Sequence, residues 1–373
     1  MPAIIGVVGG GQLGRMLATA GVPLGLRFRF WDPSPTCPAS AVGEVVVAPL
    51  DDLAAVERFT DGLGAATYEF ENIPVETVRR VAEHVSTDPP VRALEVSQER
   101  LAEKRFLESL GIPVARFASA GTRAELDSAA DHAGFPLVLK TRRFGYDGKG
   151  QVIVNGPDEL DAAWHTLGAA PAIAEQLVAF DRELSLVAAR ARDGSFQAYP
   201  LVQNTHEGGI LRATVAPAPG VSPQVQDAAE HHARAIMDEL GYVGVVTIEY
   251  FEAGGSLIAN EIAPRVHNSG HWTIEGAVTS QFAQHLRAIA GLPLGDPAPR
   301  AHAAMINLIG AAPPVDDLAS IPGAHPHLYS KSPRPGRKLG HVTVVADSAE
   351  ALAGRVAAAE RTIFGGSGTT SGP

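Results

Sequence analysis

Hydrophobic residues in the first hundred positions follow two alternating periods. Residues 3–8 form an apolar run that predicts a buried strand, residues 12–20 have the spacing of a helix, and residues 27–31 predict a second strand that ends at Asp32. Alternation of buried strands and helices is typical of a doubly wound domain with a parallel sheet. We therefore expect an α/β, Rossmann-like domain over residues 1–100.

The pattern changes after a charged helical segment at residues 97–110, which is followed by Gly111-Ile112-Pro113. Beyond it, strand-like runs come in pairs separated by Gly-rich or polar turns, which is typical of antiparallel hairpins in an α+β domain. The predicted pairs are residues 136–140 with 151–154, 172–178 with 183–191, and 243–251 with 256–263.

Two further signals organise the rest of the chain. Residues 222–240 predict a helix, because Ser222 is a good N-cap and Gly241 follows the last turn. A Pro-rich stretch at residues 291–299 precedes a third, β-rich region, whose Gly/Ser-rich end predicts a flexible tail. The expected domains are residues 1–100, 101–295 and 296–373.

Composition narrows the possible partners. The chain of 373 residues has a formal net charge of −11, so broad binding of nucleic acid is not expected. Its single cysteine, Cys37, cannot form an internal disulfide and is expected to be a small, semi-buried residue. The start of the chain has no basic leader, and no run of about 18 apolar residues occurs. We expect a cytoplasmic protein without a membrane partner.

A glycine motif follows the first predicted strand. Gly9, Gly11 and Gly14 give the G-x-G-x-x-G spacing at the start of a helix, and Asp32 ends the next strand. By spacing alone this is the dinucleotide fingerprint, in which the helix N-terminus attracts phosphate and the acidic residue meets a ribose hydroxyl. A nicotinamide-dependent enzyme is therefore one reading, and a Rossmann-like domain that holds no dinucleotide is the other.

Two carboxylates lie in the last predicted hairpin. Glu249 and Glu261 are equally far from Gly255, so a turn centred there places them opposite each other on one face. Under period two, Ala259 shares that face and Asn260 lies on the other unless the strand bends. Like charges so close are unfavourable, and a bound cation relieves them; carboxylate oxygens suit Mg²⁺. The alternative is two solvated glutamates on an exposed face.

A second glycine-rich loop follows a lysine. Lys140 ends a strand, and Gly145, Gly148 and Gly150 lie in the loop before the next strand. Backbone amides of such a loop can fold over a polyphosphate while the lysine supplies a point charge. The alternative is a mobile hairpin tip with incidental glycines. Downstream, Glu175 begins an extended EQLV stretch whose peptide groups suit a purine edge.

In chain order Lys140, GYDGKG, EQLV, Glu183, IEY and NE resemble the ATP-grasp superfamily, in which two α+β lobes clasp MgATP. The resemblance narrows to the N5-carboxyaminoimidazole ribonucleotide synthase family through GGGQLGRM, RRFGYDGKGQ, LGYVGV, NEIAPRVHNSGHWT and RPGRKLGH. It implies a Rossmann-like N-terminal domain that binds no NAD, an ATP-grasp central domain and a small C-terminal domain. It also implies ATP-dependent carboxylation of 5-aminoimidazole ribonucleotide with bicarbonate, and a homodimer.

The family's sites can be carried onto this chain. The implied ATP contacts are Arg100, Lys140, Gly145, Tyr146, Asp147, Gly148, Lys149, Gly150, Gln151, Glu175, Gln176, Leu177, Val178, Glu183, His206, Asn260 and Glu261. Magnesium is expected between Glu249 and Glu261. The implied substrate contacts are Glu69, Arg265, His267, Asn268, Ser269, Lys331, Arg337 and Lys338.

Residues 260–271, NEIAPRVHNSGH, carry the hypothesis for the chemistry. We expect Arg265 to hold bicarbonate or carboxyphosphate through its fork of donors, and the residues after it to orient the aminoimidazole. The base is either the released phosphate or His267. A zinc pair of His267 and His271 and a solvated polar loop are the alternatives for this stretch.

Other functions remain open at this point. A different ATP-grasp ligase with another acyl acceptor would keep the same nucleotide motifs, and so would a non-catalytic nucleotide-binding protein. The presence of Lys140, Glu249, Glu261 and Arg265 favours an enzyme.

Overall fold

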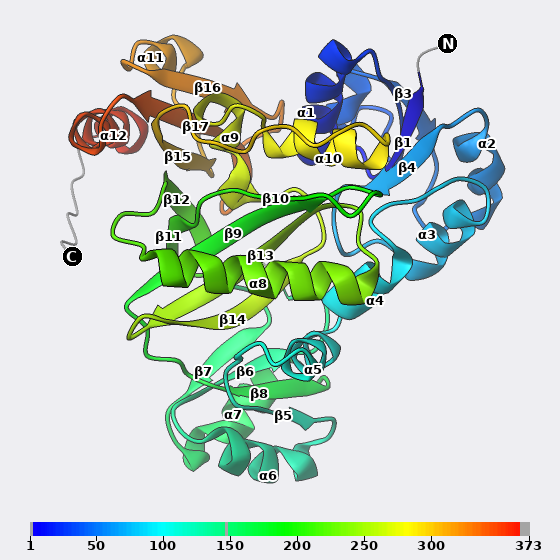
Figure 1. The fold of residues 1–373 in the computed structure, drawn as a ribbon. Helices are drawn as coiled ribbons and strands as arrows, with labels where there is room; N and C mark the ends of the chain where they lie inside the picture. Colours follow the sequence, from blue (N-terminus) through cyan, green and yellow to red (C-terminus); the bar gives the residue numbers. More distant parts are fainter. Residues whose placement is uncertain (1–2, 146–147, 366–373) are drawn as a thin grey trace.

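A parallel sheet forms the N-terminal domain. The structure is a computed structural model that describes residues 3–145 and 148–365. Strands follow the order β3-β2-β1-β4, all parallel, so the predicted Rossmann-like start is confirmed (Figure 1). The elements are β1 (Ile4–Val8), α1 (Gln12–Gly21), β2 (Arg27–Asp32), β3 (Glu44–Val47), α2 (Val56–Thr60), β4 (Ala65–Tyr68), α3 (Val75–Ala82) and α4 (Val91–Ser97).

A small lobe hangs from the rest of the molecule at the bottom of Figure 1. Its antiparallel sheet has the order β5-β8-β6-β7 and is covered by two helices. The elements are β5 (Phe117–Ala120), α6 (Arg123–Ala133), β6 (Leu137–Thr141), β7 (Gln151–Val154), α7 (Leu160–Thr166) and β8 (Ala172–Gln176).

One large antiparallel sheet runs through the centre and continues into the C-terminal region. Its order is β14-β13-β9-β11-β12-β15-β17-β16, with β10 paired to β9. The strands are β9 (Arg182–Arg190), β10 (Phe196–Ala198), β11 (Val202–Glu207), β12 (Ile210–Ala216), β13 (Gly244–Ala253), β14 (Ser256–Ala263), β15 (His302–Ile309), β16 (Ala324–Leu328) and β17 (Lys338–Ala346). The C-terminal domain is β-rich as predicted, but it extends the central sheet because β15 pairs with β12.

Helices cover this sheet and join it to the N-terminal domain. They are α5 (Arg100–Ser109), α8 (Pro223–Leu240), α9 (Thr273–Gly276), α10 (Gln281–Ile289), α11 (Val315–Ala319) and α12 (Ala349–Phe364). The caps predicted for α8 are confirmed: Ser222 accepts from the amide of Val225, and Gly241 is left-handed. Among the described residues, no helix combines the length and hydropathy needed to span a bilayer.

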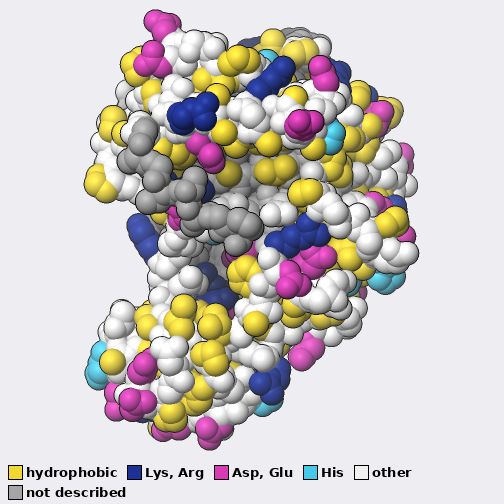
Figure 2. Space-filling view, turned by 90° about the vertical axis from the view of Figure 1, so that its left-hand side faces the viewer, with side chains coloured by type: hydrophobic (Ala, Val, Ile, Leu, Met, Phe, Trp, Pro, Cys, Tyr) yellow, Lys and Arg dark blue, Asp and Glu magenta, His cyan; other side chains and the backbone are white. Residues whose placement is uncertain are grey.

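The apolar cores show which parts of the chain are packed together. Leu17 and Phe28 of the N-terminal domain share a buried cluster with Leu286 of α10 and Val245 of β13. The small lobe instead has its own cluster around Leu139. Figure 2 shows the molecule narrowing just above this lobe. The lobe is therefore the part best able to shift against the remainder.

One local prediction was displaced and another was wrong. The helix predicted over 97–110 is present as α5 but begins only at Arg100, because α4 ends at Ser97 and Glu99 caps α5 by accepting from the amides of Leu101 and Ala102. The predicted pairing of residues 172–178 with 183–191 does not occur. Instead β8 belongs to the small sheet and β9 to the large one, so the segment between them crosses between the two lobes.

Candidate active site

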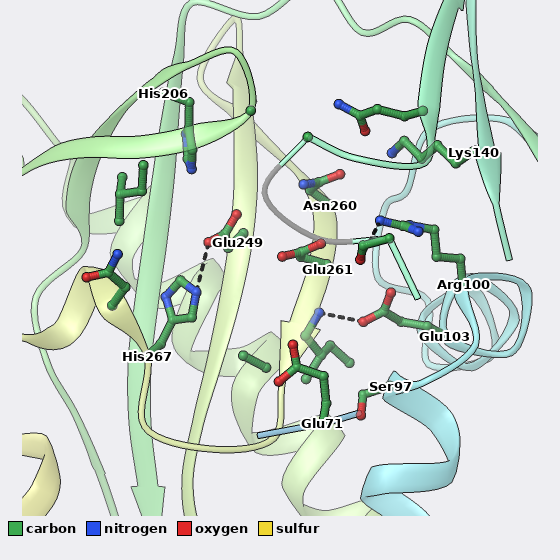
Figure 3. A pocket seen from close by; sticks show the side chains of 18 of the residues that line it. Glu71, Ser97, Arg100, Glu103, Lys140, His206, Glu249, Asn260, Glu261 and His267 are labelled. Atoms are coloured by element: carbon green, nitrogen blue, oxygen red, sulfur yellow. Dashed lines mark hydrogen bonds and ion pairs between the residues drawn. The ribbon is translucent and has the colours of Figure 1, made fainter. Parts of the chain in front are cut away.

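A cavity of about 490 Å³ lies between the small lobe and the large sheet. Figure 3 shows Glu249, Asn260 and Glu261 in its middle, with Arg100 and Glu103 on one side and His206 and His267 on the other. The predicted site residues that line it are Arg100, Lys140, Gly145, Gly148, Gln151, Glu175, Gln176, Leu177, Val178, Glu183, His206, Glu249, Asn260, Glu261, Arg265, His267, Asn268 and Lys338. Motifs that are far apart in the sequence therefore face one space.

Other predicted residues lie around this cavity. Tyr146 and Asp147 lie outside the described residues. The predicted residues that are described but do not line the cavity are Lys149, Gly150, Glu69, Ser269, Lys331 and Arg337.

A β-bulge builds the carboxylate pair. The hairpin turn is Gly254-Gly255, because Ala253 pairs with Ser256, and this register alone would place Asn260 opposite Glu249. The register shifts by one residue beside Asn260, so Glu261 pairs with Glu249 as predicted. The prediction centred the turn on Gly255 itself and used no bulge, so it named the correct pair for a different reason.

The bulge also changes which side chains share the face. Two consecutive residues of a bulged strand oppose one residue of the partner, so Asn260 and Glu261 both line the cavity. Ala259, expected beside Glu261, instead belongs to the core under α8. Strict alternation was the wrong assumption at this point.

The two carboxylates fit a divalent cation. Burial, and next to it the charge of Glu261, raise the pKa of Glu249 to about 7. A bound Mg²⁺ would relieve this repulsion with oxygen ligands of the type it prefers. Within residues 3–145 and 148–365, no group of three or more His, Cys, Asp or Glu is arranged to hold a metal. A magnesium ion at Glu249 and Glu261 would therefore take further ligands from water and phosphate.

Lys140 and Lys104 share one carboxylate oxygen. Lys140 Nζ lies 2.9 Å and Lys104 Nζ 3.4 Å from Glu175 Oε2. Burial alone would raise the pKa of Glu175, but Lys104 and Lys140 outweigh it and hold that pKa at about 2. Glu175 is thus an anion between two cations at the base of the small lobe.

Arg100 fastens the glycine-rich loop to α5. Its Nη1 donates to the carbonyl of Thr141 at 2.9 Å and its Nη2 to that of Gly145 at 3.2 Å. A Cβ on Gly145 would lie 2.3 Å from Arg100 Nη1, so a larger residue there would displace the guanidinium. Arg100 is therefore tied to the backbone of the loop that the sequence predicts to cover phosphates.

The opposite wall carries a histidine and an aromatic pair. His206 Nδ1 lies 2.8 Å from Glu183 Oε2. Burial would lower the pKa of His206, but Glu183 and the carboxylates at 249 and 261 raise it. Phe180 and Phe251 stack with their ring centroids 4.7 Å apart and also line the cavity. This face offers both an apolar platform and a polar end.

Arg265 is already engaged by a carboxylate. Its Nη2 donates to Glu71 Oε1 at 2.9 Å, its Nε donates to Glu71 Oε2, and its Nη1 donates to the carbonyl of Val266 at 3.1 Å. The expected fork of free donors is thus largely occupied by Glu71. As far as the described residues show, one N–H group on Nη1 and one on Nη2 remain for a ligand.

Hydrogen bonds fix the tautomer of His267. The amide of Ser269 donates to Nδ1 at 3.3 Å, so Nδ1 is the acceptor and Nε2 carries the proton. Nε2 lies 3.3 Å from Glu249 Oε1. Burial, together with the charge of Arg265, lowers the pKa of His267 well below its ordinary value. The side chain is thus neutral, with Nε2 facing Glu249.

The first glycine motif is filled by the chain itself. Glu69 accepts from the amides of Gly11 at 2.6 Å and Gly14 at 2.7 Å, and Asp32 accepts from the amide of Gly10 at 2.9 Å. Glu69 is only 6% exposed. The positive end of α1 therefore already holds an anion, which leaves no room there for a dinucleotide phosphate.

A basic group lies where the N-terminal and C-terminal regions meet. Lys331 Nζ donates to Gln12 Oε1 at 2.5 Å, and Arg15 Nη1 donates to Ser330 Oγ at 3.0 Å. Arg337 Nη1 donates to Ser332 Oγ at 3.0 Å, and Lys338 lines the cavity. Charges from opposite ends of the chain therefore gather beside Gln12 and Lys338, two residues that line the cavity.

Sequence reasoning missed several residues of this site. Glu71, two residues after Glu69, was not among the predicted contacts, although it lines the cavity and Glu69 does not. Glu103, Lys104 and Arg15 lie in helical segments that look like ordinary solvated surface. A cluster of charges on one helical face of residues 100–104 was the available signal.

The fold and the cavity define the class: two α+β lobes that close over a cavity with a lysine, a glycine-rich loop and a carboxylate pair form an ATP-grasp enzyme. Three family models match consecutive parts of the chain. They are the ribonucleotide synthetase preATP-grasp domain at residues 2–98, the ATP-grasp domain at 105–282 and the phosphoribosylaminoimidazole carboxylase C-terminal domain at 303–355.

Full-length relatives narrow the class. The chain is 47% identical over 359 residues to N5-carboxyaminoimidazole ribonucleotide synthase of Pseudomonas aeruginosa, covering 96% of this chain and 99% of that protein. The Thermus thermophilus synthetase structure matches with 51% identity and a TM-score of 0.93, covering 96% of this chain and 98% of that one. The Aspergillus clavatus enzyme in complex with ADP and 5-aminoimidazole ribonucleotide matches with 32% identity and a TM-score of 0.91, covering 97% and 99%. The chain belongs to the N5-carboxyaminoimidazole ribonucleotide synthase family.

Proposed function

We propose that the chain carboxylates the amine of 5-aminoimidazole ribonucleotide with bicarbonate, consuming ATP and giving N5-carboxyaminoimidazole ribonucleotide, ADP and phosphate in purine biosynthesis. The observation that carries the proposal is one continuous cavity that Lys140 and Glu175 line together with Arg265, Asn268 and Lys338. Residues 101–295 would hold ATP, and residues 1–100 and 296–373 would complete the ribonucleotide site.

The nucleotide occupies the cleft between the lobes in this proposal. Adenine lies against Glu175, Gln176, Leu177 and Val178, the ribose meets Glu183, and the triphosphate lies near Lys140 and loop 145–151. Phosphoryl transfer is mainly a matter of positioning and charge neutralisation, so no protein nucleophile is needed. When bound at Glu249 and Glu261, Mg²⁺ supplies part of that neutralisation.

Bicarbonate must be activated before it reacts, because its carbon bears a delocalised negative charge. Transfer of the γ-phosphoryl group to a bicarbonate oxygen gives carboxyphosphate. The amine nitrogen then attacks the carboxyl carbon, the bond from that carbon to the phosphate oxygen breaks, and phosphate leaves. The outer donors of Arg265 would hold the transferring oxygens, while Glu71 keeps the guanidinium in place.

The departing phosphate is the base that we favour for the amine proton. His267 Nδ1 accepts from a backbone amide, and its protonated Nε2 faces Glu249, so neither nitrogen is placed to accept that proton. Asn268 has both side-chain polar atoms buried without a hydrogen-bond partner among the described residues and lines the cavity. We assign it to the aminoimidazole ring.

The ribose phosphate belongs at the basic end of the cavity. Lys331, Arg337 and Lys338 would contact it, with Arg15 as an addition to the predicted set. Ser269 acts by holding His267, and Glu69 would act on the substrate through the 9–14 loop, because amides engage both of its oxygens. A homodimer in the cytoplasm completes the proposal.

Phosphate release from MgATP tests this function. It should require 5-aminoimidazole ribonucleotide, rise when bicarbonate is supplied rather than stripped, and disappear in a Glu249→Gln/Glu261→Gln variant. An Asp227→Asn variant on the surface of α8 serves as the matched control. Release that ignores the ribonucleotide would point to another acceptor and overturn the proposal.

A further inference from the structure

One face of α5 touches three separate parts of the nucleotide site. Arg100, Glu103 and Lys104 follow the i, i+3, i+4 spacing and therefore point to the same side of the helix. Arg100 bonds the glycine-rich loop, as described above. Glu103 Oε1 accepts from the amide of Ile262 at 2.6 Å, next to the carboxylate at 261 (Figure 3).

Lys104 makes the most central contacts of the three. Its Nζ donates to the carbonyl of Asn260 at 2.8 Å and to that of Ala259 at 3.3 Å, and it lies 3.4 Å from Glu175 Oε2. The residue is 2% exposed. A buried ammonium is costly unless its donors are satisfied, and here three acceptors surround it.

Two consequences follow for the site. The carbonyls of Ala259 and Asn260 flank the β-bulge that turns Asn260 and Glu261 into the cavity, so Lys104 stabilises that backbone geometry. Lys104 also shares the charge of Glu175 with Lys140. Without Lys104, the charge of Lys140 would be balanced by Glu175 alone and would be less available to a phosphate.

We propose that Lys104 is a positioning residue of the nucleotide site. It offsets the charge of Glu175 so that Lys140 can serve the phosphates, and it holds the bulge that presents Asn260 and Glu261. This inference rests on the proposed ATP-dependent function. In this inference α5, which lies outside the nucleotide-binding motifs, holds the adenine end of the site and the carboxylate pair in position relative to each other.

A Lys104→Met variant tests the inference. The KM for MgATP should rise about 10-fold to 100-fold, because small displacements at a phosphoryl-transfer site have effects of that size. The KM for 5-aminoimidazole ribonucleotide should change less than about 2-fold, since Lys104 lies on the nucleotide side of the cavity; a general loss of structure would not separate the two substrates. Arg105→Met, at an exposed neighbour on the same helix, is the matched control.

A double variant separates the charge from the packing. Glu175→Gln removes the carboxylate that Lys104 offsets, so Lys104→Met/Glu175→Gln should bind MgATP more tightly than Lys104→Met alone. If the fold-increase in the KM for MgATP of the double variant equals the product of the fold-increases of the two single variants, the charge-sharing argument is overturned. An unchanged KM for MgATP in Lys104→Met would overturn the inference as a whole.

Calorimetric titration with MgADP keeps the test independent of turnover. From tightest to weakest, the affinities for MgADP should follow the order wild type, double variant, Lys104→Met. Equal affinities would contradict the inference. If Lys104→Met does not fold, Lys104→Gln, which keeps an amide donor, is measured in the same way. If the wild-type protein releases no ribonucleotide-dependent phosphate, the proposed function fails, while the MgADP titration still decides whether Lys104 positions the site.

Discussion

The two glycine-rich loops of this chain look alike in sequence and differ in what they face. At loop 9–14 a Cβ on Gly11 would lie 2.4 Å from Glu69 Oε1, so the loop is packed against an anion of its own domain. At loop 145–151 a Cβ on Gly145 would lie 2.3 Å from a guanidinium nitrogen of Arg100. In the first loop, backbone amides donate to the side chain of Glu69. In the second loop, a backbone carbonyl accepts from the side chain of Arg100.

The difference decides which loop can take a phosphate. Glycine permits close approach of the backbone, but the approaching group can come from the protein or from a ligand. The first loop has an internal anion and is closed to another. Gly145 and Gly148 of the second loop line the cavity together with the cations Arg100 and Lys140, whereas the first loop contributes Gln12 and Leu13 to the cavity but none of its glycines. Spacing of glycines therefore predicts geometry, and only the neighbouring charges indicate a ligand.

The largest expected effect is at Lys140, the cation beside the second loop. Lys140→Met should lower kcat/KM for MgATP by about 100-fold or more, because removal of one preorganised charge from such a site has that cost. Steady-state phosphate release at varied MgATP measures it. Arg123→Met, at a surface ion pair of the small lobe, should leave the value unchanged. A loss of less than 5-fold would mean that the second loop does not hold the triphosphate.

Removing the internal anion of the first loop should act on stability. Glu69→Ala leaves the amides of Gly11 and Gly14 without their acceptor, which should lower the free energy of unfolding by about 2–3 kcal/mol. The KM for MgATP should stay within about 2-fold of wild type, because the loop holds no nucleotide phosphate. Urea denaturation and the phosphate-release assay check both values, with Glu57→Ala on exposed α2 as the control. A raised KM for MgATP with unchanged stability would reverse the roles of the loops.

The contrast between the two loops also explains which features of the structure could be predicted from the sequence. Local signals suffice for the strand and helix alternation before residue 100, for the caps of α8 and for the hairpin that carries Glu249 and Glu261. The filling of the first loop by Glu69 depends on a contact 58 residues away, so spacing cannot predict it. The resemblance to a known family identified that domain correctly where the glycine fingerprint alone did not.

The rest of the site depends on tertiary contacts. The bulge at Asn260 is held by Lys104, 156 residues away in the sequence, and no local pattern marks it. Residues 172–178 form a strand-like run, yet the strand pairs within the sheet of the small lobe and not with residues 183–191. A charged helix such as α5 looks solvated until its burial is known.

A methyl group at the tip of the second loop should have a smaller effect. Gly148 has φ +74, and a Cβ there would lie 2.4 Å from the carbonyl oxygen of Gly208. Gly148→Ala should raise the KM for MgATP about 10-fold, because the added Cβ would force the loop away from the β11–β12 turn. Alanine at this positive φ also costs of order 1 kcal/mol or more in backbone strain. MgATP titration of the variant measures this. Gly168→Ala has similar backbone strain but open space around it, and it should leave the KM unchanged.

The smallest expected effect concerns Glu249. Unlike Glu69, this carboxylate accepts no hydrogen bond from a backbone amide of the described residues. Its folded-state pKa is raised to about 7, above the unfolded value of 4.5, first by burial and then by Glu261. The stability that the protonated group contributes is therefore present below pH 4.5 and is lost as the pH rises through 7. Glu249→Gln mimics the protonated form, so its Tm advantage over wild type should grow between pH 5 and 8 without magnesium. Thermal melts with and without MgADP measure the difference, which the bound ligand should narrow by stabilising the ionised pair. A Tm difference that does not vary with pH would mean that Glu249 is relieved within the protein, as Glu69 is, and is not held ready for a cation.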